Sequence, residues 1–323
     1  MPVNNIVVLM LENRSYDNIL GALYLHSTPP DGQCHLDGLT GNETNPDPNN
    51  PTQTIQVHST SSPIQIGGSG PAYAPTCIPM IDTGEEFACM AQQFLSLDAI
   101  PTSDPWSGYD PAASGLMQGF TTNYSQLDKA VGQQPPPAQN LQDVMNYLTP
   151  EQLPVTAFLA ANYAVCDQWF ASVPTQTFTN RAFASLAAPA VEKPDFGKAY
   201  SYIDDEQYGP KILDARVRLP SIYQQLDAVF SNGERSSANW RVYFHDYPIS
   251  MLVDTYVWDT ALSRSNENVA CFDTTDYNNE RPPFLLHLPQ ATFVSDVANG
   301  TLPRLSFIEQ RYSNVTALPP NSA

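Results

Sequence analysis

The sequence of 323 residues is long enough to bury a sizeable core, with 42% apolar and 15% charged residues. Its net charge of −19 argues against nucleic acid as a partner, because nucleic-acid binding needs clustered Lys and Arg. An anionic substrate would be repelled at long range, so its site needs a local metal, an Arg or a helix N-terminus. No stretch is long and apolar enough to span a membrane, and no signal peptide is visible before the first apolar run.

Residues 3–11 predict the first strand, and a polar motif follows it directly. The run from Ile6 to Leu11 does not alternate, which is typical of a parallel strand buried on both faces. Chemistry in open α/β sheets gathers at the carboxyl ends of strands, where Glu12 and Asn13 offer two oxygen donors suited to a divalent cation. The alternative is an ordinary polar loop, in which Asn13 also begins a glycosylation pattern.

The next part of the chain alternates between irregular and apolar segments. Residues 27–82 are rich in Pro, Thr, Ser, Asn and Gly and predict a long excursion with little regular structure. The spacing of apolar residues predicts a helix over 83–97 and a short amphipathic helix over 141–147. The run 153–164 predicts a buried helix, and 163–173 reads as a strand that ends in a turn at Pro174.

A hydroxyl residue, Thr177, follows that turn at the start of a helix predicted over 179–188. A helix N-terminus presents unpaired N–H groups and the positive end of the dipole, features that bind phosphate and stabilise an alkoxide. Thr177 in that place would be a nucleophile if a metal or base lowered the pKa of its hydroxyl. The alternative is a plain helix N-cap, a role that Thr serves well.

The second half continues the alternation of helices and strands. Helices are predicted over 220–229 and 293–299, and strands over 240–244 and 305–309. The pattern indicates an α/β fold with a mainly parallel central sheet flanked by helices. We expect a single domain over residues 1–323, in which 190–290 forms a variable insertion or cap.

The five cysteines contain no C-x-x-C pair, which argues against a zinc knuckle. Cys166 lies in the strand-like run and is expected as a buried thiol. The other four lie in loop-like surroundings and are candidates for disulfides of unknown pairing: Cys34, Cys77, Cys89 and Cys271.

Two motifs together resemble the phosphoesterase family of bacterial and fungal phospholipases C and acid phosphatases, in the alkaline-phosphatase-like superfamily. One is Glu-Asn-Arg-Ser-aromatic-Asp, from Glu12 to Asp17, and the other is Thr-x-x-Asn-Arg, from Thr177 to Arg181, after an Asp-x-Trp-Phe segment. Weaker similarities follow in the right order at 82–87, 115–120, 240–243 and 299–309.

The resemblance implies an alkaline-phosphatase-like fold and hydrolysis of phosphate esters, with a phospholipid headgroup ester or a soluble phosphomonoester as substrate. By position, Glu12 and Asn13 match the metal ligands, although the metal is not identified, and Thr177 matches the nucleophile. Asn180 and Arg181 match residues near the phosphate; Arg181 would either bridge phosphate oxygens or clamp a carboxylate. We therefore expect the Thr177 hydroxyl within roughly 5 Å of a Glu12 or Asn13 oxygen. The family also implies an extracellular or exported protein, and the oligomeric state stays open.

The sequence departs from the family at several points. Asn18 and Glu85 stand where the family usually has His, and Thr179 stands where it often has Pro. The His-Pro-Pro-like and Asp-Glu-His-Gly-Gly segments have no counterpart, so we expect the C-terminal part of the fold to be missing. A fragment or an inactive truncated relative would show weak activity or none, with its first or last strand uncovered. The alternative function is a non-catalytic binding or surface module.

Overall fold

The computed structural model describes most of the chain, and the described residues divide into two compact units. One unit comprises 1–12 with 175–318 and 323, and the other 13–174 with 319–322, where the sequence analysis predicts one domain. The described residues are 3–11, 14–29, 36–59, 83–102, 105–106, 109–110, 112–113, 115–127, 138–188, 219–245, 248–263, 267–272 and 291–310.

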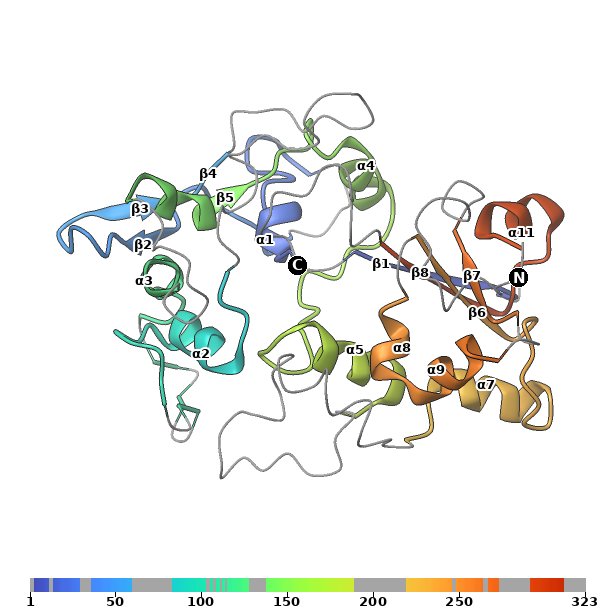
Figure 1. The fold of residues 1–323 in the computed structure, drawn as a ribbon. Helices are drawn as coiled ribbons and strands as arrows, with labels where there is room; N and C mark the ends of the chain where they lie inside the picture. The colour runs from blue at the N-terminus through green and yellow to red at the C-terminus, as the bar shows by residue number, and fades with distance from the viewer. Residues whose placement is uncertain are drawn as a thin grey trace. The chain divides into compact units, whose positions relative to one another are not determined.

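The first unit is built on a four-stranded sheet with the order β1-β8-β6-β7 (Figure 1). All three pairings are parallel, which confirms the predicted α/β class with a mainly parallel central sheet. The strands are β1 (Ile6–Met10), β6 (Trp240–Phe244), β7 (Val269–Cys271) and β8 (Leu305–Glu309), and three of them coincide with predicted strands.

Helices cover both faces of this sheet, and alternate residues of each strand point to opposite faces. Trp240, Val242 and Phe244 pack with α7 (Ile222–Phe230), α8 (Ser250–Val253) and α9 (Thr255–Ala261). On the other face, Tyr243, Ala270 and Ile308 pack with Phe293 of α11 (Phe293–Asn299). In Figure 1, α11 accordingly lies on the opposite side of the sheet from α7 and α9.

Part of the range 190–290 belongs to this sheet. Strand β6 lies between β8 and β7, and all five of its residues are buried. The described residues of this range therefore supply two strands of the sheet, together with helices that pack on it, rather than a cap alone. The sequence analysis missed β7, whose three residues are too few for a periodic pattern.

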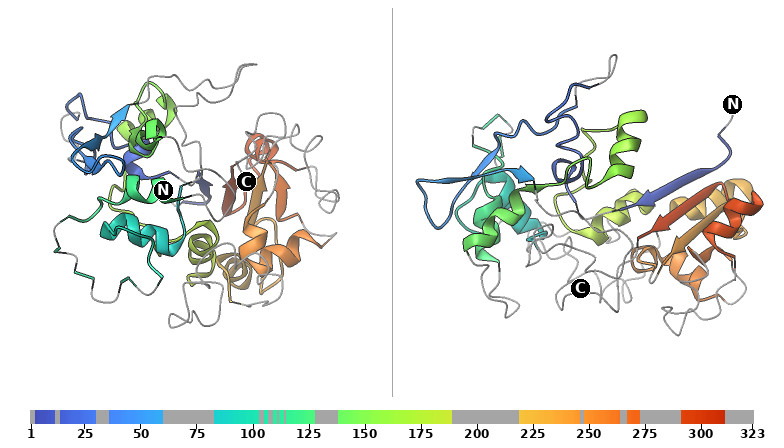
Figure 2. Two further views of the ribbon diagram at one scale, coloured as in Figure 1. Left: turned by 60° about the vertical axis from the view of Figure 1, so that its left-hand side comes forward. Right: turned by 90° about the horizontal axis from the view of Figure 1, so that it is seen from above.

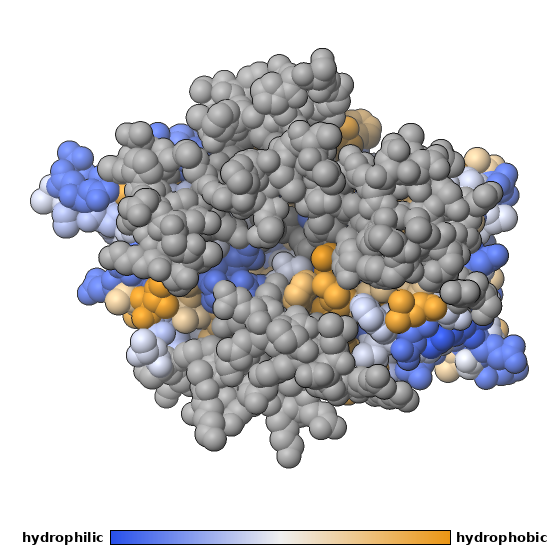
Figure 3. Space-filling view, in the orientation of Figure 1, coloured by the Kyte–Doolittle hydropathy of each residue, from blue (hydrophilic) through white to orange (hydrophobic). Residues whose placement is uncertain are grey.

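The predicted uncovered strand is β1, at the edge of the sheet beside β8 (Figure 2). Ile6 and Leu9 each expose 56% of their surface, whereas β8 is buried except for the half-buried Phe307. The expectation of a β1 buried on both faces is wrong, because its side chains are partly exposed and β8 is its one neighbour among the described strands. Apolar side chains also reach the surface shown in Figure 3, between hydrophilic ones.

The second unit is made of short elements. Inside the 27–82 excursion, β2 (Thr44–Pro46) and β3 (Thr54–Gln56) form an antiparallel hairpin, and residues 60–82 lie outside the described residues. Helix α2 (Phe87–Leu95) confirms the helix predicted over 83–97. The remaining elements are α1 (Tyr16–Ile19), β4 (His58–Ser59), α3 (Phe120–Gln126), the 3-10 helix η1 (Ala138–Met145), β5 (Asn146–Tyr147) and α4 (Pro154–Asn162).

Two predictions for this unit are wrong. Helix α4 forms as expected but contributes no buried residue, because apolar composition does not by itself supply a covering layer. The segment 163–173 is not a strand: a turn includes Asp167 and Gln168, and the Asp167 carboxylate accepts the Asp37 N–H at 2.8 Å. A strand needs a neighbour for its backbone groups, and the described strands of this unit pair with one another instead.

The cysteine predictions are partly corrected. Cys166 is exposed rather than buried, because its segment forms no strand. Cys89 and Cys271 are buried thiols rather than halves of disulfides, and Cys34 and Cys77 lie outside the described residues. Where the structure describes the chain, each helix is too short or too polar to cross a membrane.

Asp254 makes the stability of the first unit depend on pH. Its carboxylate caps α9 by accepting the backbone N–H groups of Tyr256 and Val257, at 2.9 and 3.3 Å. Burial raises the pKa of Asp254 to about 6, against the opposing effect of these hydrogen bonds. A carboxyl whose pKa is higher in the folded chain than in the unfolded chain stabilises the fold most at low pH. This contribution is fully present below the pKa of the unfolded chain and is lost as the pH rises toward 6.

We therefore predict a change in the free energy of unfolding of Asp254→Asn relative to that of the unmodified chain. This difference should rise in favour of the variant by about 2 kcal/mol from pH 4 to pH 7. Asn keeps the cap but carries no buried charge at neutral pH. Free energies of unfolding from urea titrations at both pH values measure the difference. Asp296→Asn is the control with the opposite sign, because hydrogen bonds and Arg241 outweigh burial and lower the pKa of Asp296. An equal effect of Asp254→Asn at both pH values would contradict the prediction.

Candidate functional site

Thr177 is the first residue of α5 (Thr177–Leu186) rather than its cap. Gln176 occupies the N-cap position with an extended backbone, φ −71° and ψ −176°, and its side chain makes no capping hydrogen bond. The N-cap alternative for Thr177 is therefore wrong. Its half-buried hydroxyl lies in the first helical turn, where backbone N–H groups have no partner within the helix.

Asn180 fixes the turn that precedes the helix. Its side-chain Nδ2 donates to the carbonyl oxygens of Thr175 and Gln176, at 2.8 and 3.1 Å. These bonds tie the first turn of α5 to the two residues before it. The Asn180 amide thus holds the backbone that leads into Thr177. Its contact with a phosphate, which the sequence analysis expects, stays a prediction.

Arg181 forms a buried ion pair with Glu309, the last residue of β8. Its Nη1 lies 3.2 Å from Glu309 Oε1, and the two side chains expose 3% and 0% of their surface. Of the two alternatives that the sequence left open, the structure shows the contact with a carboxylate. A contact of Arg181 with a phosphate stays a prediction.

Ser250 completes the surroundings of this carboxylate. Its backbone N donates to Glu309 Oε1 at 2.8 Å, and its hydroxyl donates to the same oxygen. Burial raises the pKa of Glu309, whereas Arg181 and the Ser250 bonds act in the opposite direction. Three donors from α5 and α8 therefore meet at one oxygen at the carboxyl end of the sheet.

The predicted metal ligands follow β1 in the sequence. Met10, the last residue of β1, aligns with Glu309, and Glu12 follows two residues later. Glu12 and Asn13 themselves lie outside the described residues, so their role and their distance from Thr177 stay predictions. Among the residues that the structure does describe, no group of three or more His, Cys, Asp or Glu could hold a metal ion.

Glu309 is nevertheless a donor of the type that a hard divalent cation prefers. The second oxygen of Glu309, Oε2, is buried and has no hydrogen-bond partner within the described structure. Carboxylate and amide oxygens are the donor types that Mg²⁺ and Ca²⁺ prefer. Glu12 and Asn13 would hold such an ion, and Glu309 supplies a buried negative charge at the neighbouring strand end.

The rest of the first motif has a structural role in the second unit. The Ser15 hydroxyl caps α1 by accepting the Asn18 N–H at 3.1 Å. Asn18, which stands at a family His position, donates from Nδ2 to the Asn146 carbonyl at 2.7 Å. Its side chain thus anchors α1 to β5, and an amide at this position transfers no proton.

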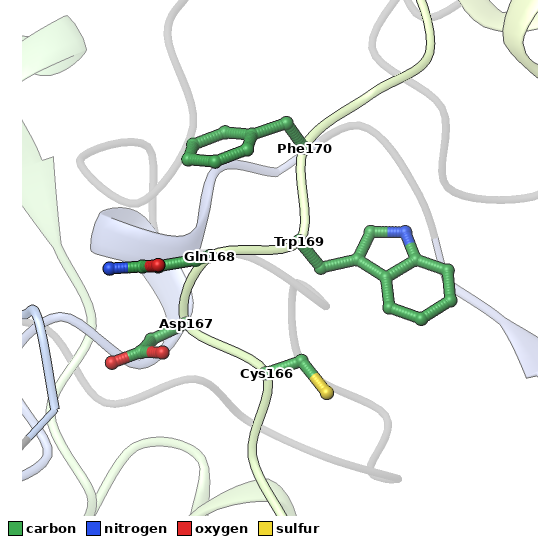
Figure 4. Close-up of a pocket in the computed structure, with 5 residues that line it drawn as sticks. All are labelled: Cys166, Asp167, Gln168, Trp169 and Phe170. Carbon is green, nitrogen blue, oxygen red and sulfur yellow. The ribbon is translucent and has the colours of Figure 1, made fainter.

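A separate pocket of about 440 Å³ lies on the segment 166–170 of the second unit (Figure 4). Trp169 and Phe170 point to opposite sides of the backbone, and both are largely exposed. The lining offers one carboxylate, from Asp167, whose Oδ2 already accepts the N–H of Asp37. This pocket therefore has no set of groups that would recognise a phosphate.

The sequence analysis missed Glu309 and Ser250 as parts of the site. Glu309 carries the signal that singled out Glu12, an acidic residue directly after an apolar strand, and was noted only as part of a similar segment. Ser250 has no sequence signal, because its role depends on a helix that begins beside a distant strand end.

Comparisons with known proteins agree with this architecture. The sequence profile of the Phosphoesterase family matches residues 3–317. Non-specific phospholipase C6 of Arabidopsis thaliana is 27% identical over 323 residues, which cover 99% of this chain and 46% of that protein. Non-specific phospholipase C1 of the same plant is 26% identical, over 99% of this chain and 45% of that protein. The chain thus spans about half the length of the curated relatives it matches.

We predict that Arg181→Met destabilises the chain by about 3–5 kcal/mol, because it leaves the Glu309 charge buried without its cation. The double variant Arg181→Met/Glu309→Gln should lose less than Arg181→Met alone, since the neutral amide needs no countercharge. Urea unfolding of both variants and of Glu309→Gln measures the coupling.

Arg235→Met serves as the control for loss of an arginine in the same unit. Arg235 is exposed and lies over the Tyr256 ring, 4.6 Å from its centroid, so its loss should cost about 1 kcal/mol or less. A double variant as unstable as the sum of its two single variants would show that Arg181 and Glu309 do not interact.

Proposed function

Because the chain belongs to the Phosphoesterase family, we propose that it hydrolyses phosphate esters by attack of the Thr177 hydroxyl on phosphorus. The proposal is supported chiefly by the position of Thr177 as the first residue of α5. Arg181 of the same helix forms an ion pair with Glu309, at the carboxyl end of a parallel strand. Ligand sites in open α/β sheets lie at that edge.

In the proposed step, Thr177 Oγ forms a bond to phosphorus as the bond from phosphorus to the leaving alcohol oxygen breaks. The alcohol leaves with a proton, and the phosphoryl group stays on Thr177 as a phosphothreonine. Water then attacks phosphorus, restores the Thr177 hydroxyl and releases the phosphate product. The N–H groups of the first turn of α5 favour the charge on the phosphoryl oxygens.

Each residue of the second motif has a distinct task in this proposal. Asn180 holds the turn at Thr175 and Gln176, so that the nucleophile starts from a fixed backbone. Arg181 holds the helix to Glu309 one turn from Thr177. A divalent ion held by Glu12 and Asn13 would supply Lewis-acid polarisation of the phosphoryl group and favour the Thr177 alkoxide.

We propose phospholipid headgroup esters as the substrate class. The support comes from the relatives, which are non-specific phospholipases C. For such a diester, the departing alcohol is the diacylglycerol, and water then releases the phosphorylated headgroup. A soluble phosphomonoester is the competing substrate, and the two are compared directly in the assay below.

We predict that Thr177→Ala lowers the turnover of p-nitrophenyl phosphorylcholine and p-nitrophenyl phosphate at least about a thousandfold, because the nucleophile is removed. The purified chain is assayed with Mg²⁺, Mn²⁺, Ca²⁺ or Zn²⁺ in turn. Higher kcat/KM on the phosphorylcholine ester would support the headgroup substrate, and the reverse order would contradict it.

Thr255→Ala is the matched control. Thr255 is likewise the first helical residue, in α9 of the same unit, and has no part in the proposed site. Its loss should leave turnover within a factor of about two. Undetectable turnover by the unmodified chain with every metal, or equal turnover by Thr177→Ala, would reject catalysis by Thr177 and favour a non-catalytic binding module.

A further inference from the structure

We infer that Glu309 is a positioning residue for the phosphoryl-transfer site: its carboxylate fixes α5, and with it Thr177, at the carboxyl end of the sheet. The inference rests on the proposed function and extends it to a residue outside both motifs. Glu309 does not contact the reacting atoms in this account and acts through Arg181.

The buried apolar cluster of α5 contains no strand residue among those that the structure describes. It consists of Ala182, Leu186 and Val253, with Phe178 and Leu219 packed against it. Val253 lies in α8, so this cluster joins α5 to a neighbouring helix. The hydrophobic effect is non-directional, whereas an ion pair depends on the positions of particular atoms. A contact of the second kind with the sheet would therefore add a definite orientation to this packing.

The Arg181–Glu309 pair supplies that direction. Arg181 follows Thr177 by four residues, so the two side chains share one helix face and lie about 6 Å apart along the axis. Because Arg181 Nη1 contacts Glu309 Oε1, the face that carries Thr177 is turned toward the carboxyl end of β8. A rotation of α5 that moved Thr177 away would also break this ion pair.

Glu309 is itself held in place by a second element. Ser250, the first residue of α8, donates both its backbone N–H and its hydroxyl to the oxygen that Arg181 contacts. The carboxylate thus joins β8, α8 and α5 at one buried point. An exposed ion pair would be screened and mobile, whereas this one exposes 3% or less of either side chain.

The pair is also matched to the chemistry of the site. Phosphoryl transfer depends on placing the nucleophile in line with phosphorus, and a misplacement of about 1 Å can cost a hundredfold in rate. A change at Glu309 should therefore lower kcat more than it raises KM. A residue that only stabilises the fold would lower the folded fraction and leave kcat per folded molecule unchanged, so kcat is calculated from the amount of folded protein.

The test compares Glu309→Gln with Asp296→Asn. Both replace a buried acidic residue of the first unit that pairs with an arginine, but Asp296 lies in α11 and contacts Arg241 of β6. Hydrogen exchange of the folded, full-length variants is followed in two peptides. One covers residues 181–186 of α5, whose amides bond within the helix, and the other covers residues 293–299 of α11.

We expect Glu309→Gln to speed exchange in α5 at least tenfold and to leave α11 within twofold of the unmodified chain. Asp296→Asn should show the reverse pattern. In the assay of the proposed function, Glu309→Gln should lower kcat at least tenfold with KM changed less than threefold. Arg181→Lys, which keeps a cation for Glu309, should recover more of kcat than Arg181→Met.

Each result decides the matter. Unchanged exchange in α5, or equal acceleration in α5 and α11, would overturn the positioning role. Local acceleration in α5 with unchanged kcat would overturn it as well, because the helix would then be loosened without effect on the reaction. If the unmodified chain shows no turnover, the proposed function fails and the role for that reaction falls with it. The exchange arm would still show whether Glu309 anchors α5.

Discussion

The buried ion pair between Arg181 and Glu309 is the interaction on which the proposed site depends. It joins the helix that begins with Thr177 to the end of β8, a strand with a neighbour on each side in the sheet. Two opposite charges are removed from water here, which is tolerated only when their hydrogen bonds are well satisfied. Ser250 provides two of those bonds, so three donors from two helices satisfy Glu309 Oε1, whereas Oε2 has no partner among the described residues.

The sheet explains why this interaction forms where it does. Parallel strands end at a common edge, and residues that follow them are brought together although they are far apart in sequence. Glu309 aligns with the end of β1, and about 300 residues separate the two strands. The acidic surface of the chain makes a local concentration of positive groups at this edge necessary for any phosphate. The N–H groups in the first turn of α5 contribute to it, whereas the charge of Arg181 is paired with Glu309.

The sequence predicted the elements that have strong periodic or apolar patterns. Strand β6 was predicted with its observed bounds because its residues alternate, and α5 was predicted within two residues because a turn precedes it. The strand predicted over 163–173 failed because the pattern of one segment does not reveal which strand edge it could join. Helix α4 shows the same limit for burial, since an apolar helix needs a covering layer that its own sequence does not describe. For the site, Thr177 and Arg181 were found through motifs, whereas Ser250 depends on tertiary contacts that leave no local signal.

The most direct test of this account is the site of covalent phosphorylation. The chain is incubated with a phosphate ester and a divalent ion, quenched in acid and analysed by mass spectrometry of its peptides. Our account predicts a phosphoryl group, or the phosphorylated headgroup of a diester, on Thr177 and none in the Thr177→Ala variant. A modification confined to another residue, or turnover by the unmodified chain without any covalent adduct, would contradict it.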